Sequence, residues 1–240
     1  MATQEWMSAG LAEQAYGMRE DLGEKAAAAR EFLQTRLAGE AHACVTSSFQ
    51  AGGIAVLHLL SQTVPEIPVL FLDTGYHFQE TLDYRDRIVD QLGLNLVNVL
   101  PQQTVQEQEA EFGILHQTAP DRCCTMRKVD PLFRALEGYR IWVTGLQRQQ
   151  SGSRAHLQTQ ESFLLPSGHR LAKLNPLAEW TARDVWQYAE ANGIPLLPLY
   201  ERGYASIGCK PCTSLPVDPG DPRSGRWNGR KQECGIHIQR

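Results

Sequence analysis

Short apolar runs recur along this chain, and segments with polar and apolar residues at helical spacing separate them. The run at 68–72 is continuous and bounded by turn signals, which is typical of a strand covered on both faces. Similar patterns predict strands at 43–47, 68–72, 95–100 and 140–144. Helices are expected at 24–38, 54–60, 78–92 and 181–191, with polar helical stretches near 104–111 and 126–136.

This alternation of strands and helices predicts an α/β fold in which a mostly parallel sheet carries helices on both faces. After about Ile207 the periodicity is lost and proline and glycine become frequent, so we expect an irregular C-terminal tail. The predicted organisation is one α/β domain over residues 1–206, with an N-terminal helical extension, followed by a tail at 207–240.

Composition narrows the class of protein. The chain has 240 residues, of which 42% are hydrophobic and 21% charged, as in ordinary globular proteins. Its net charge of -4 argues against a nucleic-acid or membrane partner, and no apolar run approaches the roughly 18 residues that span a bilayer. Residues 1–10 lack the pattern of an export signal, so a cytoplasmic location is expected. In that reducing compartment, the six cysteines indicate metal ligation or catalysis rather than disulfides.

Four of the cysteines form two close pairs, Cys123-Cys124 and Cys209-Lys-Pro-Cys212. Four thiolates suit zinc or an iron–sulfur cluster, and spacing alone leaves both open beside unrelated structural cysteines. Adjacent cysteines do not both ligate easily from a regular helix or strand, so the first pair implies a local distortion. Lys128, shortly after that pair, would moderate the negative charge of such a site.

A fifth cysteine, Cys234, stands alone with Arg230, Lys231 and His237 close by in the sequence. Cationic neighbours make a thiolate available, so Cys234 is a candidate nucleophile, although a lone cysteine near a C-terminus is more often inert. Arg223 and Arg226 lie in the same tail and would clamp an anionic substrate, or serve only as exposed solubilising charges. Cys44, inside an apolar strand, is expected to be a small buried hydrophobe.

Two turns follow predicted strands. The first, Ser47-Ser-Phe-Gln-Ala-Gly-Gly53, has the hydroxyls and small residues of a phosphate cradle at a helix start, or of a turn that merely packs closely. The second, Leu72-Asp-Thr-Gly75, lies at the carboxyl end of a strand, where ligands of open α/β sheets bind. Asp73 there serves equally well as a cap.

Six motifs occur in order along the chain: Leu72-Asp-Thr-Gly-Tyr-His-Phe-Gln-Glu-Thr81, Cys123-Cys-Thr-Met-Arg-Lys-Val-Asp-Pro-Leu132, Thr144-Gly-Leu-Gln-Arg-Gln-Gln-Ser151, Lys173-Leu-Asn-Pro-Leu177, Ile207-Gly-Cys-Lys-Pro-Cys-Thr213 and Lys231-Gln-Glu-Cys-Gly-Ile-His237. Together they resemble the adenylyl-sulfate (APS) and phosphoadenylyl-sulfate (PAPS) reductase family of sulfate assimilation. The resemblance implies a doubly wound, adenine nucleotide alpha-hydrolase-like fold. Because both cysteine pairs are present, the chain looks like the cluster-containing branch of the family, which mostly uses APS.

The resemblance also implies roles for particular residues. Cys234 matches the nucleophile, and Cys123, Cys124, Cys209 and Cys212 match the ligands of a [4Fe-4S] cluster. The positions that match substrate contacts are Ser47, Ser48, Asp73, Thr74, Lys128, Arg148, Arg223, Arg226 and His237. Two departures concern the substrate. Gln147 stands where an arginine is more usual, and Ala51-Gly52-Gly53 replaces the Ala-Glu-Asp of many cluster-containing members.

The activity that this resemblance implies is reduction of APS to sulfite and AMP through an S-sulfocysteine on Cys234. The alternative is a PAPS reductase with the same mechanism, which would release adenosine 3',5'-bisphosphate. With four thiols on a cluster and Cys44 buried, no second thiol remains to release sulfite, so thioredoxin is the expected electron donor. The sequence leaves homo-oligomer formation open.

Two rival functions have different sequence requirements. An ATP-pyrophosphatase-type enzyme would need a Ser-Gly-Gly-x-Asp-Ser loop, which residues 47–53 do not provide. A zinc-stabilised nucleotide-binding module would need only the paired thiols.

Overall fold

The computed structural model describes residues 11–218, 220–231 and 233–237. Residues 1–10, where the export-signal pattern was sought, lie outside this set. The strands are β1 (Ala43–Thr46), β2 (Pro68–Leu72), β3 (Asn95–Val99), β4 (Ile141–Val143), β5 (Gln160–Leu164) and β6 (Arg170–Leu174). The helices are α1 (Leu11–Leu37), α2 (Ala51–Thr63), α3 (Gln79–Leu92), α4 (Val105–Phe112), α5 (Leu115–Thr118), α6 (Pro120–Cys124), α7 (Asp130–Leu136) and α8 (Ala182–Ala191).

One six-stranded sheet organises the chain, in the order β3-β2-β1-β4-β6-β5. All neighbouring pairs are parallel except β5 with β6, which form an antiparallel pair at one edge. Val45 of β1 pairs with Val69 of β2 on one side and with Val143 of β4 on the other. The chain therefore builds outward from β1 in one direction and then returns to continue on its other side. This is the doubly wound, mostly parallel sheet that the sequence predicted.

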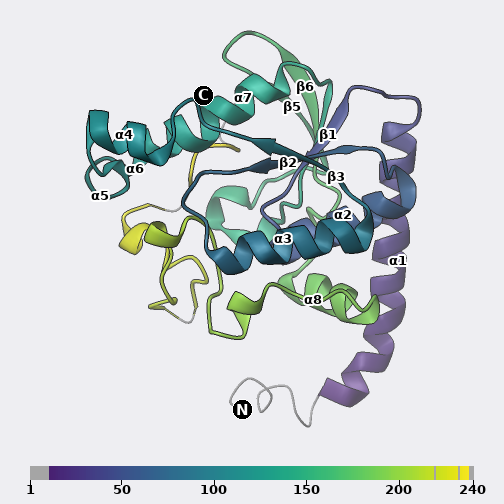
Figure 1. Ribbon diagram of the computed structural model, residues 1–240. Helices are drawn as coiled ribbons and strands as arrows, with labels where there is room; N and C mark the ends of the chain where they lie inside the picture. Colours follow the sequence, from purple (N-terminus) through teal and green to yellow (C-terminus); the bar gives the residue numbers. More distant parts are fainter. Residues whose placement is uncertain (1–10, 219, 232, 238–240) are drawn as a thin grey trace.

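The sheet buries both of its faces, because alternate residues of a strand point to opposite sides. Val45 and Val69 pack with buried residues of α1, α2, α3 and α8. Cys44, which precedes Val45 in β1, and Trp142 of β4 pack on the opposite face with Leu132 of α7. Figure 1 shows α7 on one side of the sheet and α2, α3 and α8 on the other.

Local sequence explains where several elements begin. Thr104 and Thr181 each open a helix with a reciprocal capping box, in which the threonine hydroxyl and a carboxylate three residues later satisfy free backbone N–H groups. The predicted helical stretch at 126–136 is not one regular helix. It begins with a π-helical turn at Thr125–Val129, directly after Cys123 and Cys124, and continues as α7.

The β5–β6 pair was not predicted, because its strands do not show a clean apolar pattern. In Arg170–Leu174 the central Lys173 is only 2% exposed. Its ammonium donates to Glu161 of β5 at 2.7 Å and lies over the ring of Trp142. A lysine is rarely buried without such a partner. The charged residue at the centre of the segment therefore hid its strand pattern in the sequence.

The tail has little regular structure, as expected, and folds back on the body of the protein. It contains 3₁₀ turns at Lys210–Cys212 and Trp227–Gly229 and one isolated bridge between Thr213 and Arg226. Lys210 N donates to Tyr76 O at 2.7 Å, and the Arg230 guanidinium donates to Gln117 O at 2.9 Å. The yellow end of the chain consequently lies beside α4–α6 in Figure 1.

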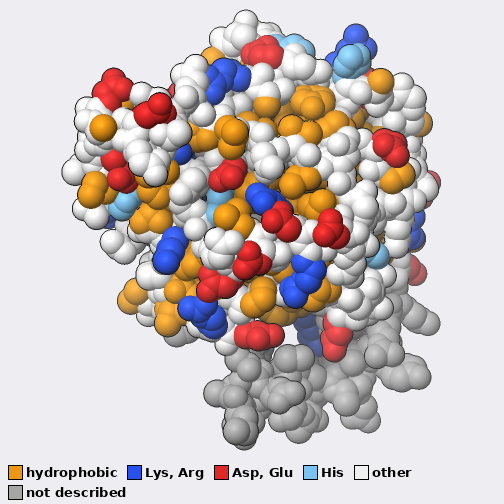
Figure 2. Space-filling view, viewed as in Figure 1, with side chains coloured by type: hydrophobic (Ala, Val, Ile, Leu, Met, Phe, Trp, Pro, Cys, Tyr) orange, Lys and Arg blue, Asp and Glu red, His pale blue; other side chains and the backbone are white. Residues whose placement is uncertain are grey.

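The surface agrees with the modest net charge. On the face drawn in Figure 2, acidic and basic side chains lie interspersed among apolar ones. Among the described residues, no helix has the length and apolarity needed to cross a bilayer.

Candidate active site

A cleft of about 850 Å³ opens at the carboxyl ends of β1 and β4. From β1 the sheet continues to β2 on one side, and from β4 it continues to β6 on the other. The cleft therefore lies at the topological switch point, where open α/β sheets bind ligands. The loops after the two strands touch closely: a Cβ added at Gly145 would lie 2.7 Å from Gly52 O. Only glycine at both positions lets the two loops meet in this way.

The predicted phosphate cradle forms one wall of this cleft. Ser47 and Ser48 both line it, and Ser47 Oγ accepts a hydrogen bond from Phe49 N at 3.0 Å. Gln50 ties the turn to the tail, because its Oε1 accepts from Ile207 N at 2.9 Å. Ala51 N donates to the hydroxyl of Tyr200 at 3.1 Å. The turn is thus braced from two sides.

The two cysteine pairs meet in a second, smaller pocket beside the cleft. Cys123 and Cys124 come from the end of α6, and Cys209 and Cys212 come from the tail. The predicted distortion at the adjacent cysteines is present as the π-helical turn that follows them. The pocket also contains Arg127, Lys128 and Arg226, along with aromatic and proline side chains, and none of its described lining residues is a carboxylate.

Burial keeps three of these thiols, those of Cys123, Cys124 and Cys212, protonated when nothing is bound to them. Burial, followed by the neighbouring sulfurs, raises the pKa of Cys123 to about 12 and that of Cys212 to about 11. Burial also raises the pKa of Cys124. A metal group bound here would therefore have to displace protons.

Asp73 and Thr74 were predicted as substrate contacts, but the structure gives them other partners. Asp73 caps its own turn by accepting from Gly75 N at 3.0 Å. Thr74 is fully buried, and its hydroxyl lies 3.3 Å from Cys209 Sγ. Neither residue belongs to the cleft lining.

Cys234 lies where the cleft and the thiol pocket meet. It lines the cleft and packs against the group formed by Cys124, Cys212 and Trp227. Its sequence neighbours Arg230 and Lys231 turn toward α5 and α6 instead, where they bind Gln117 O and the Asp121 carboxylate.

Three other cations face the Cys234 thiol. Burial disfavours the charge of Lys128, but the sulfurs of Cys209, Cys234 and Cys124 hold its pKa above the ordinary value. Arg223 and Arg226 also lie within electrostatic reach of Cys234 and line the cleft. The structure thus brings together the thiol and three of the predicted basic residues.

Arg226 is held rigidly. It is 5% exposed, donates from Nε to Cys212 O at 3.2 Å and lies over the ring of Trp227. A Cβ at position 208 would collide with its guanidinium, so Gly208 of the Ile-Gly-Cys motif makes room for this arginine.

His237 forms part of the cleft on the other side of Cys234. Its ring stacks on Trp142 with 5.3 Å between centroids. Burial, followed by the charges of Lys173, Arg154 and Arg223, holds its pKa well below the ordinary value, so the imidazole is neutral at neutral pH. Its Nδ1 is buried and has no hydrogen-bond partner in the described part of the chain.

Arg148 lies outside the cleft lining, unlike the other predicted basic residues. Its Nε donates to Leu157 O at 2.7 Å, and it pairs with the exposed carboxylate of Glu179. Arg154, six positions later, lines the cleft instead. Sequence reasoning missed Arg154 because it follows the Thr144-Gly145 motif at a distance, within a stretch of serine and glycine that shows no periodicity.

Three further lining residues were also missed. Trp186 and Tyr200 line the cleft and pack edge to face on each other. Glu233 adjoins the predicted nucleophile and lines the cleft. Its position beside Cys234 was the available signal.

This combination defines a class: a protein with an α/β nucleotide-binding fold whose cleft contains a thiol within electrostatic reach of several cations. The fold supplies the cleft, and the tail supplies the thiol. Comparison with known families identifies the chain more closely. It belongs to the phosphoadenosine phosphosulfate reductase domain family, which matches residues 42–215, and it is an oxidoreductase.

Named relatives agree with this assignment. An adenosine 5'-phosphosulfate reductase of Streptomyces coelicolor is 44% identical over 196 residues, covering 81% of each chain. One from Chelativorans is 44% identical over 211 residues, covering 87% of this chain and 84% of the relative. Among solved structures, a phosphoadenylyl-sulfate reductase from Candida auris has a TM-score of 0.69 at 26% identity, covering 78% of this chain and 90% of that one. An FMN adenylyltransferase from Candida glabrata shares the fold, with a TM-score of 0.60 at 12% identity, covering 92% of this chain and 76% of that one.

Proposed function

We propose that this enzyme reduces adenylyl sulfate to sulfite and AMP, with Cys234 as the nucleophile. The observation that carries the proposal is the position of Cys234, at the junction of the cleft and the thiol pocket and facing Lys128, Arg223 and Arg226. These cations would bind the phosphate and sulfate of the substrate and favour the charge that develops on the leaving phosphate. The high identity to named APS reductases supports the choice of substrate.

In the first step, the Cys234 thiolate attacks the sulfur of the bound sulfate group. A sulfur–sulfur bond forms, the bond from sulfur to the bridging oxygen breaks, and AMP leaves with the electron pair. The product on the enzyme is an S-sulfocysteine. We propose that His237, whose neutral imidazole also lines the cleft, hydrogen-bonds the substrate beside Cys234.

In the second step, a dithiol must supply two electrons. One of its thiolates attacks Cys234 Sγ and releases sulfite, and its second thiol then frees Cys234 as the donor becomes a disulfide. Cys44 is 0% exposed, and burial raises its pKa, so it does not serve as an internal donor. We therefore propose thioredoxin as the partner.

The four paired thiols fit a [4Fe-4S] cluster. Among the described residues, no three His, Cys, Asp or Glu side chains are grouped closely enough to hold a single metal ion. In a cluster each thiolate binds a different iron, so four thiols from two segments can share one cluster. Cys123, Cys124, Cys209 and Cys212 would hold it, and Arg127, Lys128 and Arg226 would balance its negative charge. When bound, the cluster would supply a fixed charge that orients Lys128 toward the substrate.

The named relatives favour APS over PAPS as the substrate of the cleft. Its described cations are Lys128, Arg154, Arg223 and Arg226, and each lies within electrostatic reach of Cys234, Glu233 or one another. Trp186 and Tyr200 also line the cleft, and their aromatic rings suit a nucleoside. PAPS reduction stays the second candidate, because the turn at 47–53 resembles that of PAPS-type members.

A sulfite assay coupled to reduced thioredoxin, with APS and PAPS side by side, tests the substrate and the donor together. A much higher kcat/KM with APS is expected, and the reverse ratio would favour the second candidate. Iron and acid-labile sulfide in anaerobically purified protein test the cluster, and a zinc-containing, colourless protein would refute it. The division of the chain at residues 206 and 207 and the cytoplasmic location remain predictions.

Cys234→Ser tests the nucleophile. We expect this variant to retain the iron and sulfide content of the wild type, because Cys234 is not among the proposed ligands. It should form no S-sulfo adduct when incubated with APS, as measured by intact mass spectrometry. An adduct of the same mass in this variant contradicts the assignment.

A further inference from the structure

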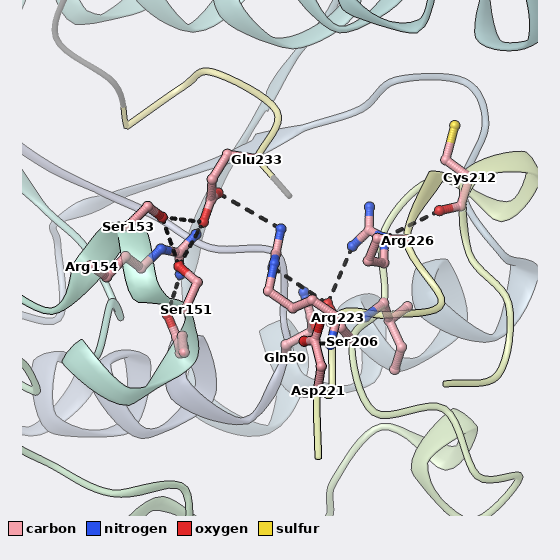
Figure 3. A network of polar contacts seen from close by, with 12 residues as sticks. Gln50, Ser151, Ser153, Arg154, Ser206, Cys212, Asp221, Arg223, Arg226 and Glu233 are labelled. Carbon is pink, nitrogen blue, oxygen red and sulfur yellow. Dashed lines mark hydrogen bonds and ion pairs between the residues drawn. The ribbon is translucent and has the colours of Figure 1, made fainter. Parts of the chain in front are cut away.

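Glu233, the residue directly before Cys234, occupies the centre of a polar network in the cleft. Its carboxylate pairs with Arg154 Nη2 at 2.9 Å and lies 3.7 Å from Arg223 Nη2. The hydroxyls of Ser151 and Ser153 donate to its other oxygen at 3.0 and 3.3 Å. Figure 3 shows Glu233 between Ser151, Ser153 and Arg154 on one side and Arg223 on the other.

The ion pair between Glu233 and Arg154 is much less exposed than the one between Lys231 and Asp121. The side chains of Glu233 and Arg154 are each 12% exposed, whereas Asp121, the partner of Lys231, is 89% exposed. Exposed pairs contribute little, and poorly solvated ones contribute more. Burial opposes the charge of Glu233, but Arg154 and Arg223 outweigh it and hold its pKa below the ordinary value, so the carboxylate is ionised.

The partner of Glu233 is itself anchored to the body of the fold. The Arg154 guanidinium donates to Gln150 Oε1, and Gln150 Nε2 donates to Gln147 Oε1 at 3.2 Å. Gln147 is 4% exposed and donates to Trp180 O and Thr181 O, at 3.1 and 3.0 Å. The network therefore connects the tail to the loop after β4, at the switch point of the sheet.

We propose that Glu233 is a positioning residue: its pair with Arg154 holds the tail in the cleft and so presents Cys234 to the substrate. Neighbouring Cα atoms are ~3.8 Å apart, so fixing the Glu233 carboxylate restricts where Cys234 Sγ can lie. The same contact must open before an external dithiol can reach Cys234. This role rests on the proposed function of Cys234, and it assigns Glu233 to the attack step rather than to nucleotide binding.

The test compares Glu233→Gln with Glu80→Gln, a matched control whose carboxylate pairs with Arg202 on an exposed surface. Without nucleotide, iodoacetamide should alkylate Cys234 about tenfold faster in Glu233→Gln than in wild type or control. In single turnovers with saturating APS, the S-sulfo adduct should form about tenfold more slowly, with KM changed by less than about threefold. Glu233→Asp, which keeps the charge, should recover part of both effects.

Arg154→Gln separates opening of the tail from a direct electrostatic effect on the thiol. Removing a negative charge favours the thiolate and removing a positive charge disfavours it, so an electrostatic effect alone gives the two variants opposite signs. If loss of the Glu233–Arg154 ion pair releases the tail, alkylation of Cys234 becomes faster in both variants. The double variant should then be alkylated no faster than Arg154→Gln alone.

Three results decide the matter. Opposite signs overturn the proposal, as does a Glu233→Gln protein that matches Glu80→Gln in both assays. A lower KM with an unchanged or faster adduct step would also overturn it, because the carboxylate would then compete with the substrate. If the wild type forms no adduct, the proposed function fails, while the alkylation results still decide whether Glu233 holds the tail.

Discussion

Replacing Gly145 with alanine should separate the two loops that form the floor of the cleft. An added Cβ would lie 2.7 Å from Gly52 O and 2.8 Å from Gly53 N, whereas ordinary contacts begin at 3.4 Å. Both neighbours are backbone atoms, so no flexible side chain can move aside. The loops after β1 and β4 must therefore part by about 0.7 Å, the difference between 3.4 and 2.7 Å.

The expected losses of stability and of AMP affinity follow from this geometry. Inserting one methyl group into a packed region typically costs about 1–3 kcal/mol. A loss of about 2 kcal/mol corresponds to a decrease in Tm of about 4–8 °C for a chain of this size. The movement also displaces the turn that is expected to hold the nucleotide phosphate. Because hydrogen bonds to charged groups contribute about 1.5–3 kcal/mol, AMP should bind about tenfold more weakly or worse.

Gly152→Ala is the matched control, because a Cβ there meets nothing within 4 Å. Urea denaturation gives the stability of both variants, and calorimetry gives the affinity for AMP. The Gly52→Ala, Gly145→Ala double variant should lose less stability than the sum of the two single variants, because each substitution separates the same two loops. Equal stability and equal AMP affinity of Gly145→Ala and Gly152→Ala would refute the close approach.

Two further predictions concern buried charges elsewhere. Glu161→Gln leaves the ammonium of Lys173, which is 2% exposed, without its ionic partner, and should cost about 3 kcal/mol in urea denaturation; an unchanged midpoint would contradict the described pair. Burial opposes the charge of Asp184, but hydrogen bonds from Thr181 and Lys25 hold its pKa below the ordinary value. The contribution of Asp184 to the stability of the fold is therefore present above the unfolded pKa of about 3.9. It is lost as pH falls through the lower folded pKa. Asp184→Asn should thus destabilise by about 1 kcal/mol at pH 7, and thermal melts should show the difference shrinking below about pH 4.

Elements with strong local patterns were predicted well from the sequence. The apolar run at 68–72 coincides with β2, and the capping box at Thr181 opens α8 as expected. The β5–β6 pair was missed because burial of Lys173 depends on Glu161 and on the ring of Trp142, which come from other strands. No window of sequence around Lys173 contains those partners.

The structure brings together the cysteines that residue type had singled out, and their roles stay predictions. The paired cysteines meet in one pocket, and Cys234 adjoins it. Prediction was less complete for the cations. Lys128, Arg223 and Arg226 were predicted, and they lie within electrostatic reach of the thiol. Arg230 and Lys231, which sequence proximity suggested, bind Gln117 O and Asp121 instead. Arg148 lies outside the cleft lining, and Arg154, which was not predicted, belongs to it. A long side chain on an irregular loop can point to either side, and only packing selects one.

The sequence by itself determined the α/β class, the two thiol pairs and the presence of a lone thiol in a basic tail, because periodicity and residue chemistry are local properties. Only the tertiary structure decided that the tail lies in the cleft, that Gly52 and Gly145 bring two loops into contact, and that Glu233 joins the segment of Cys234 to Arg154. These contacts join segments far apart along the chain, and they form only because the doubly wound sheet places the carboxyl ends of β1 and β4 side by side.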